Sequence, residues 1–137
     1  MPRVVLDPNV LVSALITPRG ASAQLLVELR GGAFELVTSP LLLDELADVL
    51  GRPKLRRYVT EEEGAEFVEL IRGASVVIDD PPAPAVAIGD DPGDEYLVTL
   101  ARAARVDALV SGDPHLLALR GRIPVQAPRE LLDSLKR

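Results

Sequence analysis

The sequence predicts an α/β fold, in which a parallel sheet of about five strands has helices on both faces. Two observations lead to this prediction. Short aliphatic runs, which are typical of strands buried on both faces, recur along the chain. Between them lie longer segments that have a helical spacing of apolar residues and capping residues at their starts. Strands that alternate with helices form βαβ units, and such units build a parallel sheet that is covered on both faces.

Each element has a local signal. The aliphatic runs predict strands over residues 3–7, 33–38, 74–78, 107–113 and 122–126, of which the last is the weakest. The helical patterns predict helices over residues 22–32, 39–50, 60–73, 94–105 and 128–137.

Capping residues define where several of these helices begin. Ser22 is the expected N-cap of the first one. Ser39 is the expected N-cap of the second, with Pro40 at its first helical position. Thr60 and Glu63 have the spacing of a capping box at the start of the third.

Length and composition indicate one domain, residues 1–137, with no internal repeat. The absence of cysteine excludes disulfides and thiolate metal sites. A net charge of −6 argues against a uniformly basic nucleic-acid surface, although it leaves room for a local basic patch. No stretch approaches the roughly 18 apolar residues of a membrane span, and Asp7 interrupts the region that a signal peptide would need. We expect a cytoplasmic protein with no membrane association.

Acidic residues follow two of the predicted strands, at the edge where α/β proteins place their ligand sites. Asp7 ends the first strand and Asp113 ends the fourth. Each precedes a proline, so each could simply cap the next helix, with Pro8 or Pro114 at the first helical position. For either residue taken alone, a cap and a functional site both remain open.

Two further acids lie on predicted helices. Asp94 would be at the third position of a helix capped by Asp91, three residues before the apolar stripe that starts at Leu97, so it would point toward the sheet. The helix dipole, worth ~0.3–1 kcal/mol, is the alternative reason for an acid there. Glu45 lies beyond the first turn of its helix, where that dipole has faded, although most glutamates are simply exposed.

Taken together, the four acids predict a metal site. Asp7, Asp94 and Asp113 map to one end of the predicted sheet, and the helix of Glu45 begins there too. Like charges gathered in a cleft repel one another and need a cation to coexist. Carboxylates without cysteine or clustered histidine favour hard ions such as Mg²⁺ or Mn²⁺, which activate water against a phosphoryl centre.

Four segments resemble, in order and spacing, the successive motifs of the PIN-domain family: VVLDPNVLVSAL, SPLLLDELADVL, DDPGDEYLVTLARAARVDALVSGDPHLL and IPVQAPRELL. The resemblance covers nearly the whole chain and is strongest to small prokaryotic toxins of toxin–antitoxin modules. It implies a three-layer α/β/α fold and a metal-dependent endoribonuclease that cleaves single-stranded RNA. It also implies a small antitoxin protein as partner and a homodimer.

The resemblance also implies roles for individual residues. The residues that would bind Mg²⁺ or Mn²⁺ and act in catalysis are Asp7, Glu45, Asp94 and Asp113. Asn9 and Ser111 would be the polar residues that orient them. Pro8 stands where the family commonly has threonine, which removes one hydroxyl from the site.

Positive charges follow the helix of Glu45, at Arg52, Lys54, Arg56 and Arg57. They could contact RNA phosphates, or they could balance an acidic chain, and the sequence leaves both open. The single histidine, His115, is interpreted as a solvated surface residue.

Other functions fit less well. A haloacid-dehalogenase-type phosphatase needs a second aspartate at the position of Asn9, and a response-regulator receiver needs a lysine after its last strand, where IPVQAP has none. The remaining alternative is a PIN-like module that binds RNA or a protein without cleaving.

Overall fold

The computed structural model describes residues 1–82 and 95–136. Its elements alternate along the chain: β1 (Arg3–Leu6), α1 (Pro8–Ile16), α2 (Ala21–Arg30), β2 (Glu35–Thr38), α3 (Pro40–Leu50), the 3₁₀ helix η1 (Pro53–Arg57), α4 (Glu61–Ala74), β3 (Ser75–Val77), α5 (Glu95–Ala103), β4 (Ala108–Val110), α6 (Pro114–Leu117), β5 (Val125–Gln126) and α7 (Pro128–Leu135).

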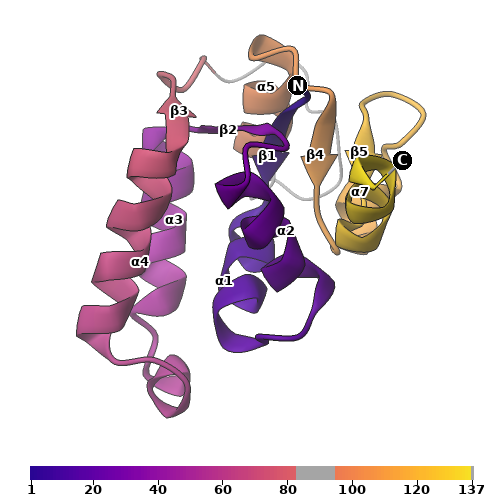
Figure 1. Cartoon of the computed structure of the whole chain (residues 1–137). Helices are drawn as coiled ribbons and strands as arrows, with labels where there is room; N and C mark the ends of the chain where they lie inside the picture. Colours follow the sequence, from indigo (N-terminus) through magenta and orange to yellow (C-terminus); the bar gives the residue numbers. More distant parts are fainter. Residues whose placement is uncertain (83–94, 137) are drawn as a thin grey trace.

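The five strands form one parallel sheet in the order β3-β2-β1-β4-β5 (Figure 1). From β1 the chain moves outward through β2 to β3, then returns through α5 to β4 on the other side of β1. Because such crossovers are right-handed, α1 to α4 cover one face and α5 covers the other. α7 packs against α2 on the first face. The predicted three-layer α/β/α arrangement around a parallel sheet of five strands is confirmed.

The centre of the sheet is buried on both faces. Val4, Val5 and Leu6 of β1 are at most 1% exposed, and each such side chain contributes about 1.5–3 kcal/mol by leaving water. The outer strand β3 differs, because Val76 and Val77 are exposed. The rigid centre therefore lies at β1 and β4, whose carboxyl ends carry Asp7 and Asp113.

Most predicted helix starts are confirmed. Ser39 accepts a hydrogen bond from the backbone N–H of Leu42, and Thr60 and Glu63 form the predicted capping box. The prediction that Ser22 is an N-cap is wrong. The N-cap is Gly20, whose carbonyl accepts the first helical hydrogen bond, and Ser22 is buried in the first turn. Glycine tolerates this position almost as well as serine does, so the chain can start the helix earlier.

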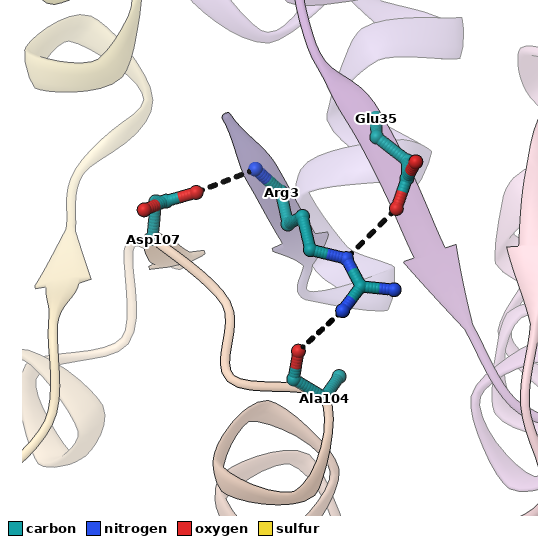
Figure 2. Close-up of polar contacts among 4 residues, drawn as sticks. All are labelled: Arg3, Glu35, Ala104 and Asp107. Carbon is teal, nitrogen blue, oxygen red and sulfur yellow. Dashed lines mark hydrogen bonds and ion pairs between the residues drawn. The ribbon is translucent and has the colours of Figure 1, made fainter. Parts of the chain in front are cut away.

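The amino edge of the sheet is held by Arg3 (Figure 2). Its Nε donates to Glu35 Oε1 at 2.8 Å, its Nη1 donates to the carbonyl of Ala104 at 2.9 Å, and its backbone N–H donates to Asp107 Oδ2 at 2.7 Å. The backbone N–H of Asp107 donates in return to the carbonyl of Arg3 at 2.8 Å. One residue of β1 thus joins the start of β2 to the segment between α5 and β4.

No single helix in residues 1–82 and 95–136 is long and apolar enough to span a membrane. α1 and α2 pass that test only as a pair, and they are bent by 97° at the break between them.

Candidate active site

Asp7 lies at the carboxyl end of β1 and is 3% exposed. One carboxylate oxygen, Oδ1, accepts from the backbone N–H of Asn9 at 2.9 Å, which caps α1. The other, Oδ2, accepts from the Ser111 hydroxyl at 2.8 Å. Burial raises the pKa of Asp7, and the negative charge of Asp113 raises it further, whereas the hydrogen bonds from Asn9 and Ser111 act in the opposite direction.

Ser111 joins the two acids at the ends of β1 and β4. Its side chain is fully buried, and its Oγ, which donates to Asp7, also accepts from the backbone N–H of Asp113 at 3.0 Å. Asp113 in turn caps α6 by accepting from the backbone N–H of His115 at 2.9 Å. Ser111 therefore lies where an orienting residue is expected.

Asp7 and Asp113 cap helices and also line a hollow. Asp7 and Asp113 each use Oδ1 to cap a helix, as the capping alternative predicts. They also line one open hollow of about 390 Å³, together with the exposed Asn9 at the start of α1. A cap uses one lone pair of a carboxylate, and the two oxygens together have about four, so a capping carboxylate can still bind another partner. His115 is exposed, as expected.

Glu45 approaches from another side. It is half-buried on α3, and its Oε2 accepts a hydrogen bond from the Tyr96 hydroxyl of α5 at 2.6 Å. Burial and this hydrogen bond raise the pKa of Tyr96 far above its usual range, and the charges of Glu45, Asp7 and Asp80 add to the effect. Tyr96 is thus hydrogen-bonded to Glu45 and is near enough to Asp7 for the charge of Asp7 to affect its pKa. Glu45 is not among the described residues that line the hollow.

Tyr96 is a residue that sequence reasoning missed. A tyrosine in a helix with apolar residues is usually interpreted as a core residue. The one signal in the sequence was that a tyrosine hydroxyl needs a hydrogen-bond partner when it is buried. Asp80 was missed as well. Its carboxylate accepts a hydrogen bond from the backbone N–H of Leu41 at the start of α3. Both contacts connect segments that are far apart in the sequence.

Asp94 and Asp91 lie outside the described residues. Within residues 1–82 and 95–136, no three acidic or histidine side chains are close enough together to hold a metal ion. The structure therefore brings Asp7 and Asp113 together, whereas the described contact of Glu45 is with Tyr96.

Comparison with known proteins gives the family. Residues 3–115 match the sequence model of the PIN domain. This chain is a PIN-domain protein. PIN domains are generally nucleases that use divalent metals. The predicted family is therefore confirmed.

One sequence relative and two solved structures of similar fold align with nearly the whole length of this PIN-domain protein. Protein MJ1680 of Methanocaldococcus jannaschii is 26% identical, with 98% of this chain and 92% of the relative aligned. The crystal structure of PAE2754 from Pyrobaculum aerophilum has a TM-score of 0.68 at 16% identity and covers 98% of this chain and 96% of its own. VapBC2 from Rickettsia felis, bound to a DNA fragment from its promoter, has a TM-score of 0.62 at 13% identity, covering 91% and 98%.

The residues at the site of this PIN domain fit a divalent cation. Asp7 is a buried carboxylate beside a second one, and no cationic side chain among the described residues forms an ion pair with it. Oxygen donors without sulfur or clustered imidazole suit Mg²⁺ or Mn²⁺. A cation at this position would offset the burial of the Asp7 charge and the repulsion from Asp113, which both raise the pKa of Asp7.

The basic residues beyond α3 separate into two groups. Arg52, Lys54 and Arg57 line a second hollow of about 400 Å³. Arg56 instead donates from Nη2 to the backbone carbonyl of Leu50, at the C-terminal end of α3. Arg56 is thus placed to stabilise the end of a helix, and it is not among the described residues that line the hollow.

Proposed function

We propose that this PIN-domain protein is a divalent-metal-dependent endoribonuclease that cleaves single-stranded RNA in the cytoplasm. The observation that carries the proposal is the buried Asp7, tied through Ser111 to Asp113 at the ends of two adjacent strands. A buried carboxylate beside a second one destabilises the metal-free protein. Such an arrangement therefore indicates a functional site, and a bound cation would compensate for the destabilisation.

In this proposal, Asp7, Glu45, Asp94 and Asp113 hold the cation, Mg²⁺ or Mn²⁺. When bound, the cation polarises a phosphate oxygen and lowers the pKa of water for in-line attack on the phosphodiester. Ser111 keeps Asp7 and Asp113 in register by donating to one and accepting from the backbone of the other. The Tyr96 hydroxyl holds the carboxylate of Glu45.

We further propose that the protein is the toxin of a toxin–antitoxin pair, that it is inhibited by a small antitoxin protein, and that it is a homodimer. The support is the fold shared with VapBC2, together with the resemblance of the sequence motifs to those of prokaryotic toxins. Expression in a bacterial host should arrest growth, and Asp7→Asn should relieve the arrest. Arrest that persists with Asp7→Asn would contradict a toxic activity at this site.

The direct test is cleavage of a labelled single-stranded RNA with Mn²⁺ or Mg²⁺, compared with EDTA. Asp7→Asn, Glu45→Gln and Asp94→Asn should each lower the rate by about a hundredfold or more, because acids that share one ion act as a unit. Asp44→Asn is the matched control, since Asp44 is exposed next to Glu45 and should keep the parental rate. Cleavage that survives EDTA, or that survives in Asp7→Asn, would contradict the proposal.

One additional variant and a second measurement complete the test. Asp91→Asn should keep most activity, and a loss there with an active Asp94→Asn would assign the third acid to Asp91. Added Mn²⁺ should raise the melting temperature of the parent by mass action and that of Asp7→Asn much less. A protein that binds RNA but shows neither cleavage nor a response to Mn²⁺ would be a silent binding module.

A further inference from the structure

A second hollow adjoins the acidic one. It has a volume of about 400 Å³ and lies between α1 and the segment around η1. From α1 it is lined by Asn9, Val12 and Ile16, and from the other side by Arg52, Lys54, Arg57 and Tyr58, among others. We call it the η1 groove. None of the proposed metal-binding residues in the described part of the chain lines it.

The η1 groove is positive within an acidic chain. Three of its described lining residues are cationic and none is acidic, whereas the whole chain has a net charge of −6. Arg52 forms an ion pair with Asp48 at 3.5 Å, but both side chains are at least half exposed, so this pair holds the guanidinium only weakly. Such a local concentration of positive charge attracts a polyanion.

Tyr58 supplies a different kind of surface. It is 55% exposed, which is unusual for one of the few aromatic side chains of this chain, and the guanidinium of Arg57 lies 5.5 Å from its ring centroid. An exposed aromatic ring with an arginine beside it offers stacking and charge at the same place. Nucleic-acid bases stack on such rings only when they are unpaired.

The η1 groove and the acidic hollow share one lining residue, Asn9. Asn9 and Ile16 are seven residues apart on one helix, so at ~1.5 Å per residue the η1 groove extends about 10 Å along α1 from the acids. Ser13 faces the acidic hollow, while Val12 faces the η1 groove. A ligand that crosses Asn9 therefore contacts both.

We propose that the η1 groove binds the single-stranded RNA next to the phosphate that is cleaved, with an unpaired base stacked on Tyr58 and the phosphates near Arg52, Lys54 and Arg57. This inference rests on the proposed function, because the acidic hollow must be the cleavage site. It adds a residue that selects unpaired RNA. Base-paired RNA presents no free base to Tyr58.

The test measures binding without cleavage, in EDTA, of a labelled single-stranded oligoribonucleotide and of the same strand annealed to its complement. Tyr58→Ala should weaken single-strand binding roughly tenfold, whereas Tyr58→Phe should stay within about twofold, because it keeps the ring. Duplex binding should be weaker in the parent and unchanged by Tyr58→Ala. Lys54→Ala and Arg57→Ala should each reduce the salt slope of log K by about 0.7.

Two matched charge controls distinguish the η1 groove from general electrostatics. Arg30→Ala removes an exposed charge at the end of α2 and should leave the slope unchanged. Arg56→Ala removes the charge next in sequence to that of Arg57. It should lower the melting temperature and change the salt slope less than Arg57→Ala does. Equal binding of single strand and duplex, or parental binding by Tyr58→Ala, would overturn the inference. The alternative occupant of the η1 groove would then be a protein partner. If either result is found and Asp7→Asn has also lost metal-dependent cleavage, the inference about the η1 groove is wrong and the proposed function still stands.

Discussion

Asp7 shows how a single residue meets two requirements. Its Oδ1 caps α1 and its Oδ2 accepts from Ser111, so each oxygen accepts one hydrogen bond, and the carboxylate is 3% exposed beside Asp113. Asparagine could cap the helix as well as aspartate does. The negative charge is therefore not needed for the cap, and its burial beside Asp113 is unfavourable in the absence of a cation. Asparagine would nevertheless lose the acceptor that the Ser111 hydroxyl uses.

This gives a prediction about pH. The pKa of Asp7 is raised above its ordinary value of 3.8 in the folded state, so between the two values the folded protein keeps a proton that the unfolded chain has lost. In EDTA, the free energy of unfolding of the parent relative to Asp7→Asn should fall as the pH rises from about 4 through the raised pKa, then level off. Urea unfolding at a series of pH values measures the difference, in which contributions from acids that do not interact with Asp7 cancel. A difference independent of pH would contradict the raised pKa, and Mn²⁺ should reduce the dependence.

At the scale of elements, α3 and α5 are joined beside the site by one hydrogen bond. Tyr96 donates to Glu45 at 2.6 Å across 51 residues of sequence. The ring of Tyr96 packs against the core, and its hydroxyl is the part that reaches α3. A residue that orients a metal-binding carboxylate commonly affects metal affinity about 10–100-fold without binding the metal itself.

Tyr96→Phe should therefore leave the fold intact and weaken the site. We expect the apparent Mn²⁺ affinity and the RNA cleavage rate at fixed Mn²⁺ each to fall about tenfold, because Glu45 loses the donor that holds it. Mn²⁺ titration followed by melting temperature measures the first effect independently of activity. Tyr58→Phe is the control, since it removes the same hydroxyl from the other tyrosine of the chain and should leave the Mn²⁺ affinity unchanged. Parental Mn²⁺ affinity in Tyr96→Phe would assign Tyr96 to packing alone.

At the scale of the whole molecule, the two edges of the sheet have different roles. The carboxyl edge carries the acids, and the amino edge carries the Arg3 contacts with Glu35, Ala104 and Asp107 (Figure 2). Because β1 is central and only four residues long, both roles depend on the same strand. Substitutions at opposite ends of β1 should therefore separate stability from activity.

Arg3→Ala should lower the free energy of unfolding by about 1–2 kcal/mol, because two side-chain hydrogen bonds are lost at a partly exposed position. Urea unfolding measures this loss, and Arg30→Ala should change stability by less than about 0.5 kcal/mol. The Mn²⁺-dependent cleavage rate of folded Arg3→Ala should equal that of the parent. A selective loss of cleavage with unchanged stability would show that the amino edge contributes to the site.

The sequence by itself determined the fold class, the order of the five strands and of the long helices between them, and the family. These features depend on local signals: aliphatic runs predict the strands, Ser39 and the capping box of Thr60 and Glu63 predict helix starts, and ordered motifs identify the PIN domain. Ser22 failed as a cap because glycine and serine are nearly equivalent at that position, so that local propensity could not choose between them.

Only the tertiary structure decided which partners the functional side chains have. It joined Asp7 to Ser111 across 104 residues, gave Glu45 the Tyr96 hydroxyl, and separated Arg56 from Arg57, which is adjacent in sequence. The sequence left a cap and a site as alternatives at Asp7, whereas the structure shows that one carboxylate caps the helix and also faces Asp113. The physical reason is that a hydrogen bond or a charge acts through space over a few ångströms, and the chain folds distant residues to that distance.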